Sequence, residues 1–254
     1  MSNNIFITGA GSGIGAATAC LLAANGWRVG LADRDGQAVQ ALTEELGGMA
    51  RGYCVDVLDR GGLRDALADF AGPDGRLGGL FNSAGLLDMH PFAEASPERM
   101  QSVIDVNVTG VINCIHTALP FLQAHGDARV ITMSSAAAIY GVPDLGVYSA
   151  SKFAIRGLTE ALNIELEGQG IWVCDLMVGY VDTPMLSKAD HAAKSVELAG
   201  VHVTPAMVAE TVREALSERK VHWFVREDDA GAQAVFDETP IEERRDLMRP
   251  STGY

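Results

Sequence analysis

Basic side chains are in short supply in this sequence. Its 254 residues include 19 Lys and Arg against 33 Asp and Glu, which gives a formal net charge of −14. Proteins bind nucleic-acid phosphates through clustered Lys and Arg, so this balance argues against a nucleic-acid partner. The excess of acidic groups is typical of a chain whose charge keeps it soluble.

Cysteine is also scarce, and its spacing excludes several kinds of site. The four cysteines, Cys20, Cys54, Cys114 and Cys174, lie far apart in the chain, so they form neither a CxxC redox motif nor a zinc knuckle. We expect them to be buried as small apolar residues in a reducing compartment. No cluster of His, Asp and Glu has the spacing of a metal site, so no metal is expected.

Long apolar runs are missing as well. None reaches the ~20 residues that a membrane span needs. The first residues, MSNNIFITGAG, lead directly into a strand pattern, without the basic and apolar regions of a signal peptide. We therefore expect a cytoplasmic protein that makes no contact with a membrane. No linker or internal repeat divides the chain, so residues 1–254 are predicted to form a single domain.

What the sequence does contain is a regular alternation of short apolar runs and helical patterns. The predicted strands are 4–8, 27–32, 50–55, 77–82, 129–134, 170–176 and 221–225. The predicted helices between them are 14–25, 37–46, 61–70, 97–124 and 147–167, with a bend or break at Pro120. This order predicts the α/β class: a Rossmann-like, doubly wound parallel sheet of about seven strands, with helices on both faces.

The last third of the chain is less regular. Residues 184–200 are mixed in pattern, and we expect a mobile helical flap over the substrate at 184–203. Residues 204–218 begin Thr-Pro, which is a good helix start. The C-terminal tail, 228–254, is highly charged, and its pattern places it nowhere in the fold.

A glycine-rich loop follows the first predicted strand. Gly9, Gly11, Gly13 and Gly15 fall within the run TGAGSGIG, and a helix follows. Glycines let such a turn take positive φ and let the backbone approach a pyrophosphate, while the helix N-terminus offers free N–H groups to phosphates. A lone GxGxxG is weak evidence, but this one lies between a strand and a helix, as dinucleotide binding requires.

The residues after the second strand bear on which dinucleotide is bound. Asp33 can accept hydrogen bonds from the adenosine ribose, and its charge would repel a 2′-phosphate, which favours NAD over NADP. Arg34 is the competing signal, since a guanidinium could neutralise that phosphate. Ser12 stands in the glycine loop where a basic residue would favour NADP. We therefore predict NAD, and NADP is the alternative.

Tyr148 and Lys152 open a predicted helix, four residues apart. That spacing places the phenol and the ammonium on one helix face. A free tyrosine has a pKa of about 10, and a nearby ammonium, together with the positive nicotinamide of an oxidised cofactor, would favour the phenolate. Tyr148 would then serve as a general acid/base. Taken alone, a Tyr and a Lys four residues apart often occur by chance on a surface helix.

These segments together resemble the short-chain dehydrogenase/reductase family in its ordinary single-domain form. TGAGSGIG resembles the family's TGxxxGxG loop, and the run at 82–85, Asn-Ser-Ala-Gly, is similar to its NNAG motif. Asn107 matches the helix asparagine of the family. Ser135 precedes Tyr148 by the family's spacing, so we prefer Ser135 to Ser134 as the catalytic serine. The resemblance covers roughly residues 4–225 and implies an NAD(P)-binding domain.

The resemblance implies a role for each matched residue. Ser135 would hydrogen-bond the substrate oxygen, and Tyr148 would exchange its proton. Lys152 would hold the nicotinamide ribose and lower the pKa of Tyr148, and Asn107 would anchor a water between Lys152 and solvent. The predicted catalytic set is Asn107, Ser135, Tyr148 and Lys152. The predicted cofactor set is Gly9, Gly11, Ser12, Gly13, Ile14, Gly15, Asp33, Arg34, Asp56, Val57, Asn82, Ala84, Gly85, Tyr148, Lys152, Val181 and Thr183.

Two of these residues could instead have purely structural roles. Asn107 could merely cross-link elements of the fold, and Asp56 could end a strand instead of accepting from the adenine amino group. One departure from the family concerns Val178-Gly179, where Pro-Gly is usual. Losing the proline is expected to loosen or reshape the wall beside the nicotinamide.

The expected pocket walls, 86–90, 136–142, Tyr180 and the segment from Met185, are mostly apolar or small. They contain no Arg or Lys to clamp a carboxylate or phosphate. We therefore predict hydride transfer between NAD(H) and an uncharged, hydrophobic secondary alcohol or ketone. The alternatives are an NADP-dependent carbonyl reductase, a non-catalytic NAD sensor, and an epimerase or dehydratase. The resemblance also implies a homotetramer or homodimer packed through helices 97–124 and 147–167.

Overall fold

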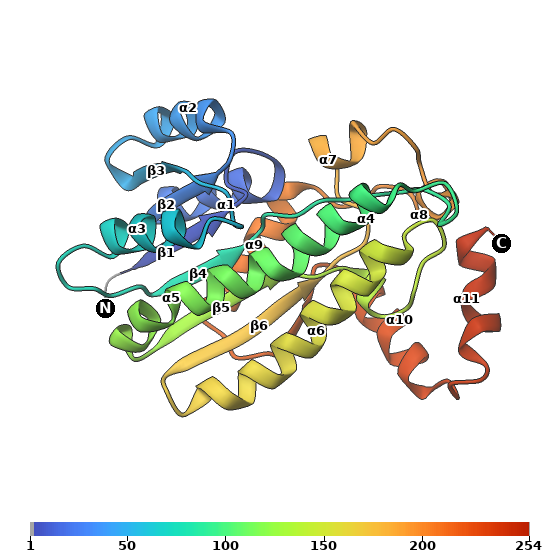
Figure 1. Cartoon of the computed structure of the whole chain (residues 1–254). Coiled ribbons are helices and arrows are strands. Elements are labelled where there is room, and N and C mark those ends of the chain that lie inside the picture. The colour runs from blue at the N-terminus through green and yellow to red at the C-terminus, as the bar shows by residue number, and fades with distance from the viewer. Residues whose placement is uncertain (1–2, 254) are drawn as a thin grey trace.

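A seven-stranded sheet forms the centre of the molecule in the computed structural model, which describes residues 3–253 (Figure 1). All its strands are parallel, in the order β3-β2-β1-β4-β5-β6-β7. This confirms the predicted Rossmann-like class. The strands are β1 (Asn4–Thr8), β2 (Arg28–Asp33), β3 (Ala50–Cys54), β4 (Gly79–Asn82), β5 (Ala128–Met133), β6 (Ile171–Met177) and β7 (His222–Phe224).

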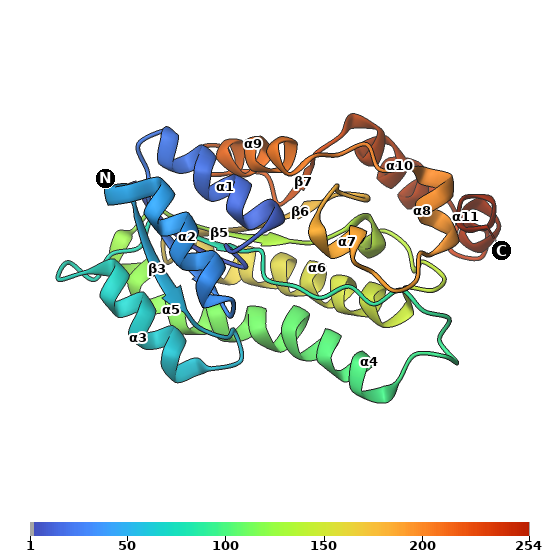
Figure 2. The same cartoon turned by 90° about the horizontal axis from the view of Figure 1, so that it is seen from above.

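Helices cover both faces of this sheet. One layer consists of α1 (Gly13–Ala24), α2 (Gly36–Leu46) and α9 (Pro205–Ala215); the other consists of α3 (Arg60–Ala71), α4 (Pro97–Ile104), α5 (Val111–His125) and α6 (Gly146–Glu167). Figure 2 shows α1 and α9 on one side of the sheet and α3, α5 and α6 on the other. Central strands β1, β4 and β5 are buried along their whole length, as parallel strands between two helical layers must be.

Local sequence signals fix where several helices begin. Asp35 accepts hydrogen bonds from the backbone N–H groups of Gln37 and Ala38 at the start of α2, at 3.1 and 3.0 Å. Asp59 caps α3 in the same way. Each such cap contributes about 1 kcal/mol to helix stability. These caps hold the helices in the positions from which their apolar faces pack on the sheet.

The long helical stretch before β5 departs from its prediction. No break occurs at Pro120, which lies inside the continuous helix α5. The interruption lies earlier, at a π-helical segment, Asp105–Gly110, that separates α4 from α5 and contains Asn107. The backbone is therefore irregular beside the candidate site and helical at the proline. Among the described residues, Pro97–His125 is also the one helical stretch long and apolar enough to span a membrane; here it packs against α3, α6 and the sheet.

The charged tail, which the sequence could not place, forms two helices, α10 (Glu227–Glu238) and α11 (Arg244–Thr252). Phe236 anchors α10, because its side chain is buried against Ile139 and Met177. Burying a phenylalanine contributes about 1.5–3 kcal/mol. Helix α11 packs against α8 (Lys194–Ala199) at the end of the molecule where Figure 1 places the C-terminus. Tyr254 lies outside the described residues.

The order of the strands changes direction between β1 and β4. From β1 the next strands, β2 and β3, lie on one side, whereas from β4 the next strands, β5 to β7, lie on the other. Ligands of such sheets bind in the crevice beyond the carboxyl ends of the strands at this reversal. The glycine loop follows β1, Asn82 ends β4, and Ser135 follows β5. The fold thus brings segments distant in sequence to one edge.

Candidate active site

The glycine loop has the shape that close approach of a phosphate requires. Gly9 and Gly13 have φ of 67° and 53°, which other residues rarely adopt. A Cβ atom on Gly9 would lie 2.6 Å from the backbone N of Ala84, and one on Gly15 would lie 2.2 Å from the carbonyl O of Gly9. The loop therefore passes between β4 and the start of α1 without room for side chains. Helix α1 begins here with no side-chain cap at Ser12, so its first N–H groups face the groove.

Asp33 is fixed at the end of β2 by two backbone hydrogen bonds. Its Oδ2 accepts from the N–H of Gly11 at 2.9 Å, and its Oδ1 accepts from the N–H of Asp35 at 3.0 Å. The carboxylate thus ties the glycine loop to the second strand. Arg34 is exposed beside it.

A groove of about 230 Å³ runs between the glycine loop and β4, where a dinucleotide would lie. Most of the predicted cofactor residues line it: Gly9, Ser12, Gly13, Ile14, Asp33, Arg34, Asp56, Val57, Ala84, Gly85 and Thr183. The other predicted residues lie behind or beside it. Gly11 and Gly15 shape the loop, Val181 lines the neighbouring cavity, and Asn82 is buried below.

The buried groups around this groove fit a nucleotide. Asn82 donates from Nδ2 to Thr132 Oγ1 at 3.1 Å, but its Oδ1 has no partner among residues 3–253. A buried amide oxygen without a partner is costly, so a donor on a bound ligand would relieve it. Asp56 is exposed, and one of its oxygens accepts from the N–H of Leu58 at 2.9 Å, so its turn-forming role is observed and its adenine contact stays a prediction.

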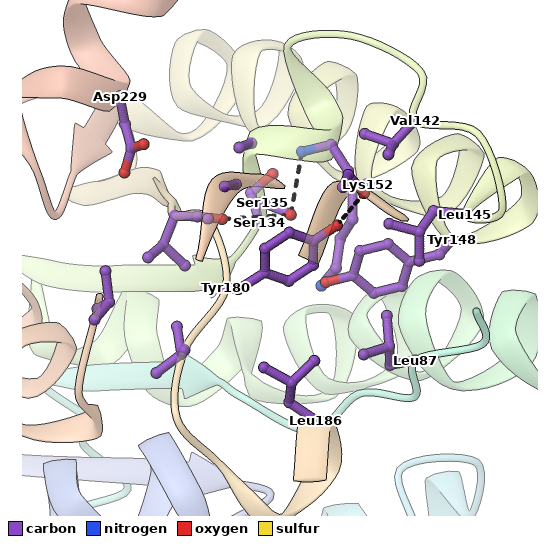
Figure 3. A pocket seen from close by; sticks show the side chains of 18 of the residues that line it. Leu87, Ser134, Ser135, Val142, Leu145, Tyr148, Lys152, Tyr180, Leu186 and Asp229 are labelled. Atoms are coloured by element: carbon purple, nitrogen blue, oxygen red, sulfur yellow. Dashed lines mark hydrogen bonds between the residues drawn. The ribbon is translucent and has the colours of Figure 1, made fainter. Parts of the chain in front are cut away.

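The predicted catalytic residues meet where the groove opens into a second cavity. Tyr148, Lys152 and Ser135 all line this cavity, which has a volume of about 300 Å³ (Figure 3). The Ser135 hydroxyl lies near enough to Tyr148 to act on its pKa. Lys152 lies with Nζ 5.4 Å from the centroid of the Tyr148 ring and donates to the carbonyl O of Met133 at 2.8 Å. The YxxxK pair is therefore part of a cavity wall and not a surface accident.

Burial dominates the protonation of both groups. It raises the pKa of Tyr148 to about 12, although the nearby Ser135 hydroxyl works in the opposite direction. It lowers the pKa of Lys152 to about 8, against the opposing charge of Asp175. Burial of Tyr148 outweighs the proximity of Lys152, whose own pKa is lowered by burial and whose ammonium donates to a backbone carbonyl. The positive charge of a bound nicotinamide would then have to lower the pKa of Tyr148 and favour its phenolate.

Asn107 is buried on the π-helical segment, and its side-chain amide hydrogen-bonds other groups of the protein. Its Oδ1 accepts from the N–H of Leu86 at 2.7 Å, and its Nδ2 donates to the carbonyl O of Leu86 and to Ser151 Oγ at 2.9 and 3.1 Å. It thus joins the loop after β4 to the helix that carries Tyr148. The cross-linking role is observed, and the water-holding role stays a prediction.

Ser134, the competing serine, is buried, and its Oγ has no partner among the described residues. Ser135 is the serine that contacts Tyr148, as the spacing predicts. Val178, in place of the usual proline, is only 3% exposed, and its carbonyl accepts from the N–H of Ala136 at 2.9 Å. The wall beside Ser135 is consequently packed at this residue, and the expected loosening is not seen.

The segment predicted as a flap covers the cavity. It contains α7 (Pro184–Ser187) and α8, and a backbone bridge joins Val181 to Val203 at its two ends. Arg99 on α4 forms ion pairs with Asp190 of this segment at 3.1 Å and with the buried Asp88 at 2.9 Å. The segment is therefore held to the body of the protein by charge as well as by the bridge. Its mobility stays a prediction.

The structure corrects one inference about the cavity. The predicted walls contain no Arg or Lys, but residues outside them add Arg226 and Asp229 to the lining, together with Ser251. Sequence reasoning missed them because no pattern placed the tail over the site. Three successive acidic residues at 227–229 are typical of the first turn of any helix, so they gave no signal of a pocket.

The lowered pKa of Lys152 predicts a pH dependence of stability. A lysine whose folded-state pKa is about 8 binds fewer protons in the folded state than in the unfolded state between pH 8 and its unfolded pKa of about 10.4. Wild-type stability should therefore rise through this window, and Lys152→Met should lack that rise. At pH 7 the variant should be up to about 3 kcal/mol more stable, since each pKa unit is about 1.4 kcal/mol.

Urea unfolding of both proteins from pH 7 to 10 would measure the difference, in which the other titrating groups cancel. If the difference in free energy of unfolding between the two proteins stays constant with pH, burial does not lower the pKa of Lys152.

With this geometry in place, the comparisons with known proteins identify the family. The sequence pattern described as "short chain dehydrogenase" matches residues 3–194. The chain is 36% identical over 187 residues to a 2,5-dichloro-2,5-cyclohexadiene-1,4-diol dehydrogenase of Sphingobium indicum, covering 73% of this chain and 75% of that one. It is 32% identical over 221 residues to a cyclohexanol dehydrogenase of Acinetobacter, covering 84% and 86%.

A solved structure agrees with these relatives. The short-chain dehydrogenase/reductase of Burkholderia phymatum in complex with NAD superposes with a TM-score of 0.81 at 25% identity, over 92% of each chain. The chain belongs to the short-chain dehydrogenase/reductase family and is an oxidoreductase of that class. This family membership supports a nicotinamide cofactor and small alcohols or ketones as substrates.

Proposed function

We propose that this protein transfers hydride between NAD(H) and an uncharged, mainly hydrophobic secondary alcohol or ketone. The observation that carries the proposal is that Tyr148, Ser135 and Lys152 line one cavity where it meets the cofactor groove. The cavity walls support the substrate class, since Leu87, Val142 and Leu186 present hydrocarbon to its interior (Figure 3). The relatives named for cyclohexanol and a cyclic diol point the same way.

In the oxidation direction, Tyr148 would take the hydroxyl proton of the substrate while Ser135 donates a hydrogen bond to the same oxygen. A bound nicotinamide supplies the hydride acceptor at the reacting carbon. Lys152 would hold the nicotinamide ribose, and its buried ammonium would stabilise the phenolate once the site is filled. In the reduction direction the same groups run in reverse, with Tyr148 giving its proton to the ketone oxygen.

A panel of secondary alcohols and ketones, followed through the absorbance of the reduced nicotinamide, tests this proposal. Turnover of uncharged hydrophobic substrates with NAD is expected. Preference for phosphorylated or acyl-thioester substrates would contradict the substrate class. Tight NADH binding with no turnover across the panel would favour a sensor.

The choice of NAD predicts a cofactor switch at Asp33. Asp33→Asn keeps the size of the side chain and removes the charge that would repel a 2′-phosphate, but its amide can accept from only one of the two N–H groups, of Gly11 and Asp35, that the carboxylate satisfies. We expect kcat/KM with NAD to fall about 10- to 100-fold, since one charged hydrogen bond contributes roughly 1.5–3 kcal/mol, and kcat/KM with NADP to rise about 10-fold. Steady-state kinetics with both cofactors measures it.

Arg34→Ala is the matched control. It should leave NAD kinetics nearly unchanged, because Arg34 is exposed and the predicted ribose contact belongs to Asp33. If wild type prefers NADP and Arg34→Ala abolishes that preference, the prediction of NAD is wrong.

We also propose a homotetramer or homodimer packed through α5 and α6. The apolar side chains of Ile164, Phe153 and Ile112 on these helices are exposed to 80%, 43% and 45%, and a partner subunit would cover them. A cytoplasmic location remains part of the same proposal.

A further inference from the structure

Asp229 places a carboxylate in an otherwise largely apolar cavity. It is the third residue of α10 and lines the cavity that contains Tyr148. Figure 3 shows Asp229 and Tyr148 on different sides of that cavity. The backbone N–H of Gly179 lies near the carboxylate and favours its charged form, but Oδ2 is buried without a hydrogen-bond partner among residues 3–253. One acceptor oxygen of this cavity-lining residue is therefore left unused by the protein.

The other acidic residues of the same turn behave differently. Glu227 and Asp228 are exposed, and Asp228 is paired with Arg226. Favourable interaction with the N-terminus of α10 explains why three acidic residues stand there. It does not explain why Asp229 alone is turned inward and partly buried, since solvent would have satisfied its oxygens at no desolvation cost.

The groups around Asp229 leave its Oδ2 unsatisfied. Burial raises the pKa of Asp229 and Arg226 opposes that rise, yet the Arg226 guanidinium hydrogen-bonds Asp228. Tyr140 lies near enough for Asp229 to raise its pKa, but no hydrogen bond joins the two among the described residues. A buried acceptor without a partner costs about 1–3 kcal/mol, and more when it is charged. Such a group in a ligand cavity is a site for a donor on the ligand.

We propose that the substrate carries a hydroxyl group remote from its reacting carbon and that Asp229 accepts a hydrogen bond from this hydroxyl. The substrate class becomes a diol or a hydroxyketone on a small hydrocarbon frame. This inference rests on the proposed function, because it assumes that Tyr148 marks the reacting end. A neutral hydroxyl is preferred to an ammonium because Arg226 already supplies a positive charge beside the carboxylate.

Asp229 is well placed to distinguish this chain from others of its family. The family pattern ends at residue 194, whereas Asp229 belongs to the tail beyond it. The packing of Phe236 against Ile139 and Met177 fixes the helix that carries Asp229, seven residues before Phe236. The tail therefore supplies a selective group to a cavity whose catalytic residues are common to the family.

The test compares substrates that differ by one donor. Cyclohexanol, the cyclohexanediols and the monomethyl ethers of those diols are assayed with NAD on wild type, Asp229→Leu and Asp229→Asn. Wild type should prefer the best diol to its methyl ether by about 10- to 100-fold in kcat/KM, the range for a hydrogen bond to a charged group. Asp229→Leu should lose this preference and retain oxidation of cyclohexanol, and Asp229→Asn should fall between.

Glu227→Gln is the matched control, because it removes a charge from the same helix turn but faces solvent. It should keep the wild-type preference. NADH titration of each variant confirms that the fold is intact. An unchanged diol preference in Asp229→Leu, or no preference in wild type, would overturn the inference. A stronger preference for the aminocyclohexanols than for the diols would overturn the choice of a hydroxyl.

A failure of the proposed function gives a different result. If wild type oxidises no alcohol of the series, the thermal shift produced by diol and by methyl ether is measured on the NADH-bound protein. A larger shift with the diol, lost in Asp229→Leu, would support the Asp229 contact while the proposed reaction fails. Equal shifts would overturn the contact.

Discussion

Tyr148→Phe should lower kcat by about 10²- to 10⁴-fold, the usual contribution of a positioned acid/base group. The change removes the hydroxyl that lies near Ser135 at the junction of groove and cavity, and it leaves the ring that packs beside Lys152. NADH affinity and thermal stability should change little. Steady-state kinetics and NADH titration on the same preparations separate the two effects.

Tyr180→Phe provides the matched control. Tyr180 lines the same cavity, but its hydroxyl lies 2.6 Å from Ser195 Oγ on the covering segment, and that bond joins it to no predicted catalytic residue. Its loss should raise KM by less than about 10-fold, the effect of one neutral hydrogen bond of about 1 kcal/mol. Equal losses of kcat in both variants would remove Tyr148 from the acid/base role.

Gly15→Ala should disable cofactor binding. The added Cβ would lie 2.2 Å from the carbonyl O of Gly9, so the glycine loop would have to move away from its position over Ala84. Overpacking of this kind costs about 1–3 kcal/mol of stability. We expect NADH affinity to fall by more than about 100-fold, since both the turn and the helix N-terminus that face the phosphates shift together.

Gly48→Ala is the control for this change. Gly48 is exposed, and no atom lies within 4 Å of the position its Cβ would take. The variant should bind NADH as wild type does. Fluorescence titration of NADH and urea unfolding measure both properties, and wild-type affinity in Gly15→Ala would show that the loop does not contact the cofactor.

Sequence reasoning worked best where chemistry depends on short spacing. The glycine loop needs its glycines within seven residues, and Tyr148 and Lys152 need to share one helix face, so both could be read from neighbouring letters. The strands were also recognisable, because buried parallel strands appear as short apolar runs. Ser135 was preferred to Ser134 on spacing, and the structure brings Ser135 against Tyr148.

Other features depend on which distant segments meet. The sequence predicted a bend or break at Pro120, yet the irregular backbone lies at Asp105–Gly110, where Asn107 bonds the backbone of Leu86. Burial also raises the pKa of Tyr148 and lowers that of Lys152, although the two groups are neighbours. Neither result follows from local pattern, since burial depends on the whole packed structure.

The sequence by itself determined the class of fold, the nucleotide loop and the acid/base pair, because each follows from residue spacing within one strand, turn or helix. Only the tertiary structure decided what closes the cavity. The tail has no periodicity linking it to the site, and its helix α10 is positioned by Phe236 packing against residues nearly sixty and a hundred positions earlier. Long-range burial of that kind placed Asp229 in the lining of a cavity whose walls local pattern had described only as apolar or small.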